Sequence, residues 1–121
     1  MNKTTSALSA DIPILYEDDI LIIIDKPAGL PTQATLDKRR PHVYGLLHEQ
    51  LKTGNPEAYL ALHHRLDKDT SGVLLFCKDK RYNQKISDMF KTHRFKKIYW
   101  ALTEDGKAKK TWRINYIQNN L

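Results

Sequence analysis

One short stretch of the sequence gathers most of the side chains that could do chemistry. Residues 64–72, HRLDKDTSG, hold a histidine, two cations, two carboxylates and two hydroxyls before a glycine. Apolar runs flank this stretch, so we expect a loop held at both ends by buried strands, which is a rigid mount for a reactive side chain. Thr70 and Ser71 can satisfy loop amides. On composition alone, a charged hairpin connection with Arg65 and Asp67 in a local ion pair is the favoured alternative.

Two adjacent histidines next to this loop raise the question of a zinc site. We expect His63 and His64 to lie on a strand, where neighbouring side chains point to opposite faces. No cysteine or third histidine stands at ligand spacing. The sequence therefore predicts no metal.

The segments around the loop are typical of strands. Residues 20–24 are apolar on both alternating faces, which indicates a buried central strand, and an acidic turn precedes them. Two prolines and a glycine then make residues 26–31 a shaped loop. We expect strands at residues 12–16, 20–24, 59–62, 73–77 and 97–103.

Two helices are expected between these strands. From residue 42, Val43, Leu46, Leu47 and Leu51 recur at helical spacing, and residues 53–56, TGNP, are typical of a helix C-terminus, so we expect a helix that ends before them. Asp79 can cap a second helix over residues 80–92, with Ile86, Met89 and Phe90 facing inward. The fold class is therefore α+β, with a mixed, largely antiparallel sheet and a few flanking helices.

Length and charge narrow the class of protein further. The chain has 121 residues, enough for one domain, and we expect residues 1–11 to be a flexible tail and residues 12–121 to fold. Residues 80–113 hold eleven Lys and Arg against three acids, a balance that attracts phosphate backbones, although a solvated lysine-rich face is as plausible. The single cysteine, Cys77, and the lack of a secretory signal or a long apolar run predict a cytoplasmic protein without a membrane segment.

The loop has a counterpart in a known family. HRLDKDTSGVLLF resembles the signature of the RluA-type pseudouridine synthases. Residues 25–31, DKPAGLP, resemble that family's lysine-proline-glycine loop, and residues 97–101, KIYWA, its lysine-x-tyrosine strand. The resemblance runs from about residue 12 to residue 102.

The resemblance implies isomerisation of uridine to pseudouridine in rRNA or tRNA, without a metal or organic cofactor. The N1–C1′ bond breaks, the uracil rotates, and C5 is joined to C1′. Asp67 matches the family's single aspartate, whose role is either attack on C1′ or abstraction of a sugar proton. Asp69 matches a variable position.

The same resemblance implies roles for other residues. Arg65 matches an arginine that enters the RNA stack where the uridine has left. Tyr99 matches a tyrosine that packs on the flipped base, and we expect it to be a catalytic residue. For His64 we expect a role in shaping the loop rather than in proton chemistry. The residues expected at the RNA are Arg65, His64, Lys26, Thr70 and Lys97.

The family's catalytic domain is longer than this chain, and residues 103–121 match none of its later motifs. The resemblance therefore implies that this chain is the N-terminal part of an incomplete pseudouridine synthase domain. An inactive, truncated enzyme is one form of this expectation. A non-catalytic RNA-binding remnant and the product of a broken reading frame are the alternatives. The target uridine and the oligomeric state stay open.

Overall fold

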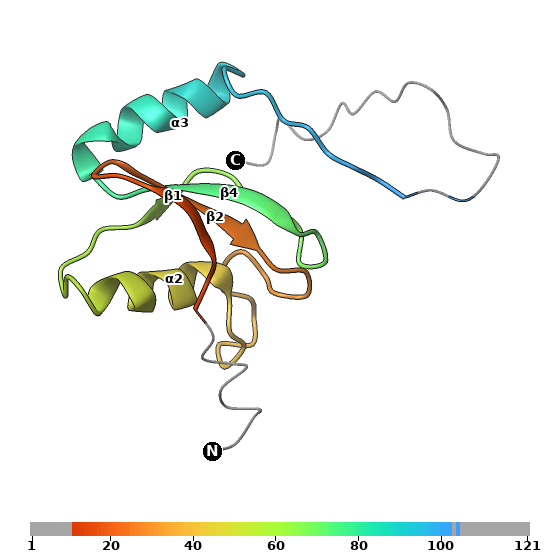
Figure 1. Ribbon diagram of the computed structural model, residues 1–121, viewed down its shortest axis with the longest axis horizontal. Coiled ribbons are helices and arrows are strands. Elements are labelled where there is room, and N and C mark those ends of the chain that lie inside the picture. The colour runs from red at the N-terminus through yellow and green to blue at the C-terminus, as the bar shows by residue number, and fades with distance from the viewer. Residues whose placement is uncertain (1–10, 103, 105–121) are drawn as a thin grey trace.

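A four-stranded sheet is the centre of the fold in the computed structural model, which describes residues 11–102 and residue 104. The strand order is β1-β2-β4-β3, and every pair is antiparallel. The helices lie on opposite faces of this sheet (Figure 1). The α+β class with a largely antiparallel sheet is confirmed. The strands are β1 (Ile14–Glu17), β2 (Leu21–Lys26), β3 (Ala61–Leu62) and β4 (Gly72–Cys77).

One face of the sheet is closed by α2 (Val43–Lys52). Alternate residues of β2, Ile22 and Ile24, are fully buried in one cluster with Val43 and Leu47 of the helix. Burial of each such side chain contributes about 1.5–3 kcal/mol. The apolar spacing in the sequence predicted this helix to within a residue at its C-terminal end.

The other face is covered in part by α3 (Asn83–Lys91). The carboxylate of Asp79 accepts a hydrogen bond from the main-chain N–H of Arg81 at 2.9 Å, as the capping pattern predicted. The first turn is a separate 3₁₀ helix, η1 (Lys80–Tyr82), so the expected helix over 80–92 is divided in two. Ile86 and Phe90 are buried with Cys77 of β4.

The strand expected at residues 97–103 is wrong for residues 97–102, and residue 103 lies outside the described residues. Figure 1 shows the chain leaving the sheet after α3, and no strand among the described residues runs alongside it to complete a hydrogen-bonded ladder. Ile98, Trp100 and Leu102 are consequently exposed to solvent. The predictions for residues 1–10 and 105–121 also fall outside the described residues. No described helix has the length and apolar character needed to cross a membrane.

Candidate active site

The register of the sheet brings two loops together that are distant in the sequence. Lys26, the last residue of β2, pairs with Gly72, the first residue of β4. The loop after β2 (the proline-glycine loop, residues 27–32) and the loop before β4 (the aspartate loop, residues 63–71) therefore leave the same end of the sheet. The main-chain N–H of Gly29 donates to the carbonyl of Lys68 at 2.8 Å. Gly29 has φ +89°, a conformation that favours glycine.

Lys26 lies beneath both loops with a fully buried side chain. Its Nζ donates to the carbonyls of Pro27 at 3.0 Å, Lys68 at 2.8 Å and Thr70 at 2.8 Å. An ammonium group has three donors, so this arrangement uses all of them. Burial lowers the pKa of Lys26, and the negative charges of Asp69 and Asp67 partly oppose that shift. We expected Lys26 to contact RNA, but a side chain enclosed by three carbonyls supports the aspartate loop from below.

Thr32 makes a second connection between the loops, which the sequence did not reveal. Its buried hydroxyl donates to the carbonyl of Leu66 at 2.6 Å and accepts from the N–H of the same residue at 3.2 Å. Leu66 is itself buried and directly precedes Asp67. The main chain on the N-terminal side of Asp67 is thus fixed. A lone threonine in a loop carries no sequence signal for such a role.

The tip of the aspartate loop is a tight turn with exposed side chains of both charges. The N–H of Thr70 donates to the carbonyl of Asp67 at 3.0 Å, and its carbonyl binds Lys26, so Thr70 contributes to the described loop through its main chain. Asp67, Asp69 and Arg65 are all exposed. The alternative ion pair between Arg65 and Asp67 does not occur among the described residues. Both charged groups are accordingly available to a ligand.

His64 fixes the path of the chain into this loop. Its Nε2 accepts a hydrogen bond from the main-chain N–H of Leu75 at 3.0 Å, and its ring stacks on Phe90 with a centroid distance of 4.7 Å. Burial, followed by the positive charge of Lys97 and by His63, lowers the pKa of His64 to about 4. The ring is therefore neutral at pH 7 and acts as an acceptor.

The two histidines do not diverge as we expected. Both rings lie near Phe90, with His63 at a centroid distance of 6.4 Å. The reason is that β3 ends at Leu62, so neither histidine lies on a strand. Within residues 11–102 and 104, no group of three potential metal-binding side chains occurs.

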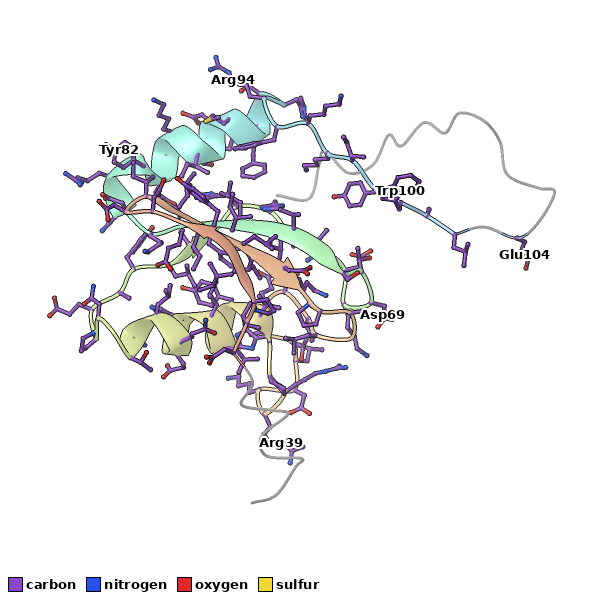
Figure 2. The ribbon with its side chains drawn as sticks, viewed as in Figure 1. Arg39, Asp69, Tyr82, Arg94, Trp100 and Glu104 are labelled. Carbon is purple, nitrogen blue, oxygen red and sulfur yellow. The ribbon has the colours of Figure 1, made fainter. Side chains whose placement is uncertain are left out.

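The aspartate loop and β4 border a groove of about 670 Å³. Thr70 and Gly72 are among its lining residues, and the segment of residues 95–100 also lines it. Tyr99 therefore shares this groove with the loop, and Lys97 borders it with its Nζ 5.8 Å from the centre of the Phe90 ring. Asp67 lies outside the lining. Figure 2 shows Asp69 on the loop tip and Trp100 on the facing segment.

The sequence profile of a known family matches this region. The profile described as RNA pseudouridylate synthase aligns with residues 20–120, most of the chain. The chain belongs to the RNA pseudouridylate synthase family. Its similarity to the RluA-type members of the family, inferred above from the loop motif, is also borne out by the relatives.

Individual relatives show the same similarity. The ribosomal large subunit pseudouridine synthase C of Rickettsia felis is 43% identical over 91 residues, which are 74% of this chain and 28% of that protein. The human mitochondrial pseudouridylate synthase RPUSD4 is 35% identical over 96 residues, covering 74% of this chain and 24% of that protein. The solved structure of human RNA pseudouridylate synthase domain containing 4 matches with a TM-score of 0.56 at 32% identity. That match covers 76% of this chain and 33% of the human one.

Proposed function

We propose that this chain carries the reacting aspartate of an RNA pseudouridine synthase, and that this aspartate is Asp67. The observation that carries the proposal is the aspartate loop, which holds an exposed carboxylate on a main chain tied down by Lys26 and Thr32. A nucleophile or base reacts efficiently only when it is held close to its target. The chain spans about a quarter of the length of several relatives. The catalytic activity of this chain is therefore proposed here and is not taken from those relatives.

The proposed reaction needs only one protein carboxylate. Asp67 either attacks C1′ of the uridine, so that an ester forms as the N1–C1′ bond breaks, or removes a sugar proton to give a glycal and free uracil. In the first route the uracil turns and C5 attacks C1′ as the ester bond to Asp67 breaks. In the second route C5 of the turned uracil joins C1′ of the glycal while the sugar carbon takes its proton back from Asp67. In both routes the hydrogen on C5 is released and N1 gains a proton, so Asp67 is regenerated as a carboxylate. No metal or organic cofactor takes part.

Neighbouring side chains are proposed to hold the RNA. Arg65 is exposed two residues before Asp67 and would fill the space that the flipped nucleotide leaves in the stack. Tyr99 lines the groove and would pack on the uracil. Lys97 and Thr70 border the same groove and would contact the sugar and phosphates. His64 would act through the loop that it shapes.

The proposed substrates are rRNA and tRNA, in the cytoplasm. One relative is named for the ribosomal large subunit and another as mitochondrial, so both the RNA and the compartment need direct tests. Incubation with rRNA and tRNA labelled with tritium at C5 of uridine tests the substrate, because each turnover releases one tritium. Immunodetection in fractionated cells tests the compartment.

The decisive variants are Asp67→Asn and its neighbour Asp69→Asn. Both remove one charge from the same exposed turn, but only Asp67 is proposed to react. We expect tritium release from the wild-type chain and from Asp69→Asn, and a loss of at least about 100-fold in Asp67→Asn, since loss of a nucleophile has a large effect on rate. Release that persists in Asp67→Asn would show that another group reacts.

A non-catalytic RNA-binding role is the second candidate. The excess of exposed cations on α3 and the segment after it favours this role independently of Asp67. Salt-sensitive RNA binding without tritium release, equal in wild type and Asp67→Asn, would support it over the enzyme.

A further inference from the structure

A group of cations without acidic partners among the described residues lies at the end of α3 and in the segment that follows. Lys91, Arg94 and Lys96 are all exposed. The only acid between residues 80 and 102 is Asp88, whose carboxylate accepts a hydrogen bond from Gln84 at 2.9 Å. The ion pairs among the described residues all lie elsewhere. These three positive charges are therefore available to an anionic ligand.

The chain that carries these cations is held in place at its start. His93 adopts φ 55°, which turns the chain sharply after α3, and the N–H of Arg94 donates to the carbonyl of Met89 at 3.0 Å. Phe95 then stacks on Phe90 with a centroid distance of 4.2 Å. Arg94 and Lys96 on either side of Phe95 are thus attached to an anchored backbone. A fixed set of charges binds a polyanion at a lower entropic cost than a mobile one.

An exposed aromatic side chain follows the cations. Trp100 is 99% exposed, an unusual state for the largest apolar side chain. An extended segment on which cations precede an aromatic ring is suited to single-stranded nucleic acid, because phosphates bind the charges and an unpaired base stacks on the ring. A lipid surface or an acidic peptide would not require a flat stacking surface. The combination favours single-stranded RNA.

The same segment leads to the aspartate loop. Residues 95–100 line the same groove as Thr70, Ser71 and Gly72. In Figure 2, Arg94 lies at the end of α3, Trp100 lies farther along the segment, and Asp69 lies on the neighbouring loop tip. A strand bound along this segment would therefore run toward the aspartate loop.

We propose that Lys91, Arg94, Lys96 and Trp100 form a track for the single-stranded RNA that flanks the target uridine. The three cations bind successive phosphates, and Trp100 stacks on an unpaired base between them and the aspartate loop. The proposal deepens the proposed function, since it names the RNA that reaches the same site. The track is tested by measuring RNA binding, so the result does not depend on whether the chain is catalytically active.

The charge part of the track is tested with two matched triple variants. The first is Lys91→Gln/Arg94→Gln/Lys96→Gln, and the control is Lys38→Gln/Arg39→Gln/Arg40→Gln. The control also removes three exposed positive charges, and Arg39 lies far from Arg94 in Figure 2. Fluorescence anisotropy of a labelled oligouridylate about 15 nucleotides long gives the affinity of each chain over a range of salt concentrations.

We expect the track variant to bind at least about tenfold more weakly than the control at low salt. The slope of log affinity against log salt should fall by about 2, because each phosphate contact on a single strand contributes about 0.7. The control should have nearly the affinity and the slope of the wild type, apart from a small decrease caused by its lower net charge. Equal losses in the two variants would overturn the track, since they would show that only the total charge matters.

The stacking part is tested at Trp100 in a Trp112→Phe background, where Trp100 is the single tryptophan. Bound oligouridylate should quench the tryptophan fluorescence. Trp100→Ala should weaken binding about tenfold with an unchanged salt slope, because stacking releases no counterions, and Trp100→Phe should restore much of the loss. Unquenched fluorescence on saturation with RNA would overturn the role of Trp100.

The class of partner is tested with three further probes. Duplex RNA of the same length, vesicles of phosphatidylcholine with phosphatidylserine, and polyglutamate should each bind more weakly than oligouridylate. Equal or tighter binding of any of them, with the same dependence on Arg94, would overturn the assignment to single-stranded RNA. Binding that depends on the track without tritium release would leave the track standing and reject the enzyme. Tritium release from a chain whose RNA binding is unaffected by the track variant would support the enzyme and reject the track.

Discussion

A neutral histidine in the aspartate loop constrains the main chain of the candidate site. Nε2 of His64 faces the N–H of Leu75, so it must keep a lone pair on that side. Protonation would place a donor against a donor, and burial opposes the charge as well. Both effects favour the neutral ring. The main chain that leads into Asp67 is therefore sensitive to the protonation of His64.

The pH dependence of stability should reveal this constraint. The pKa of His64 is about 4 in the folded chain, against about 6.5 for a free histidine. Between these values the unfolded chain binds a proton that the folded chain does not, so the contribution is complete above pH 6.5 and is lost as pH falls toward 4. The loss is at most about 3 kcal/mol. Urea unfolding at several pH values measures it.

His64→Gln and His93→Asn separate this effect from other titrations. Glutamine can accept the Leu75 hydrogen bond without titrating, whereas His93 is exposed and has no such partner. Subtracting each variant's curve from that of the wild type cancels the carboxylates. We expect the slope between pH 6.5 and 4 to be reduced more in His64→Gln than in His93→Asn. The same slope in all three chains would exclude His64 as the source.

At the level of elements, the site depends on an interlock between two loops. Asp67 and Arg65 could be found in the sequence because they belong to one continuous motif. The two residues that hold the loop in place could not be found in the sequence. Lys26 donates to carbonyls 42 and 44 residues away, and Thr32 binds Leu66, 34 residues away. Those contacts follow from the pairing of β2 with β4, and strand register is a long-range property that local patterns do not specify.

The same reasoning explains which elements the sequence predicted. A helix such as α2 satisfies its own backbone hydrogen bonds, so its apolar spacing was enough to locate it. Residues 97–102 have strand-like composition, but a strand exists only beside another strand. No described strand lies beside them, and the prediction failed for that reason.

Lys26→Met should test the interlock. Methionine is similar in size and apolar, but it leaves the carbonyls of Pro27, Lys68 and Thr70 without their donor. Loss of buried hydrogen bonds to a charged group should lower the free energy of unfolding by about 3 kcal/mol. Hydrogen exchange should also rise at the Gly29 N–H, which bonds to Lys68.

Lys38→Met is the control, because Lys38 is exposed on a polar loop. It should change the unfolding free energy by less than about 0.5 kcal/mol. Equal exchange at Gly29 in both variants would show that the loops hold together without Lys26.

At the level of the whole molecule, the two faces of the sheet are covered unequally. The α2 face is closed, whereas the α3 face leaves Val73 61% exposed beside a groove. Ile98 and Leu102 are exposed on the segment that follows α3, and β1 is an edge strand with Leu15 and Tyr16 exposed. Exposed apolar residues next to an open sheet edge promote association between chains.

We therefore expect the isolated chain to self-associate, and the segment that is proposed to bind RNA to be involved. Sedimentation velocity at increasing protein concentration should show a rising weight-average sedimentation coefficient. Ile98→Lys/Leu102→Lys should reduce the rise, whereas Gln33→Lys/Ala34→Lys, which adds the same charge on an exposed loop, should not.

Added salt separates association between chains from the proposed binding of RNA, both of which involve this segment. Association through apolar surface is maintained or strengthened by salt, whereas RNA binding through Lys91, Arg94 and Lys96 is weakened. Association that salt abolishes would show that charges, rather than the exposed apolar residues, join the chains.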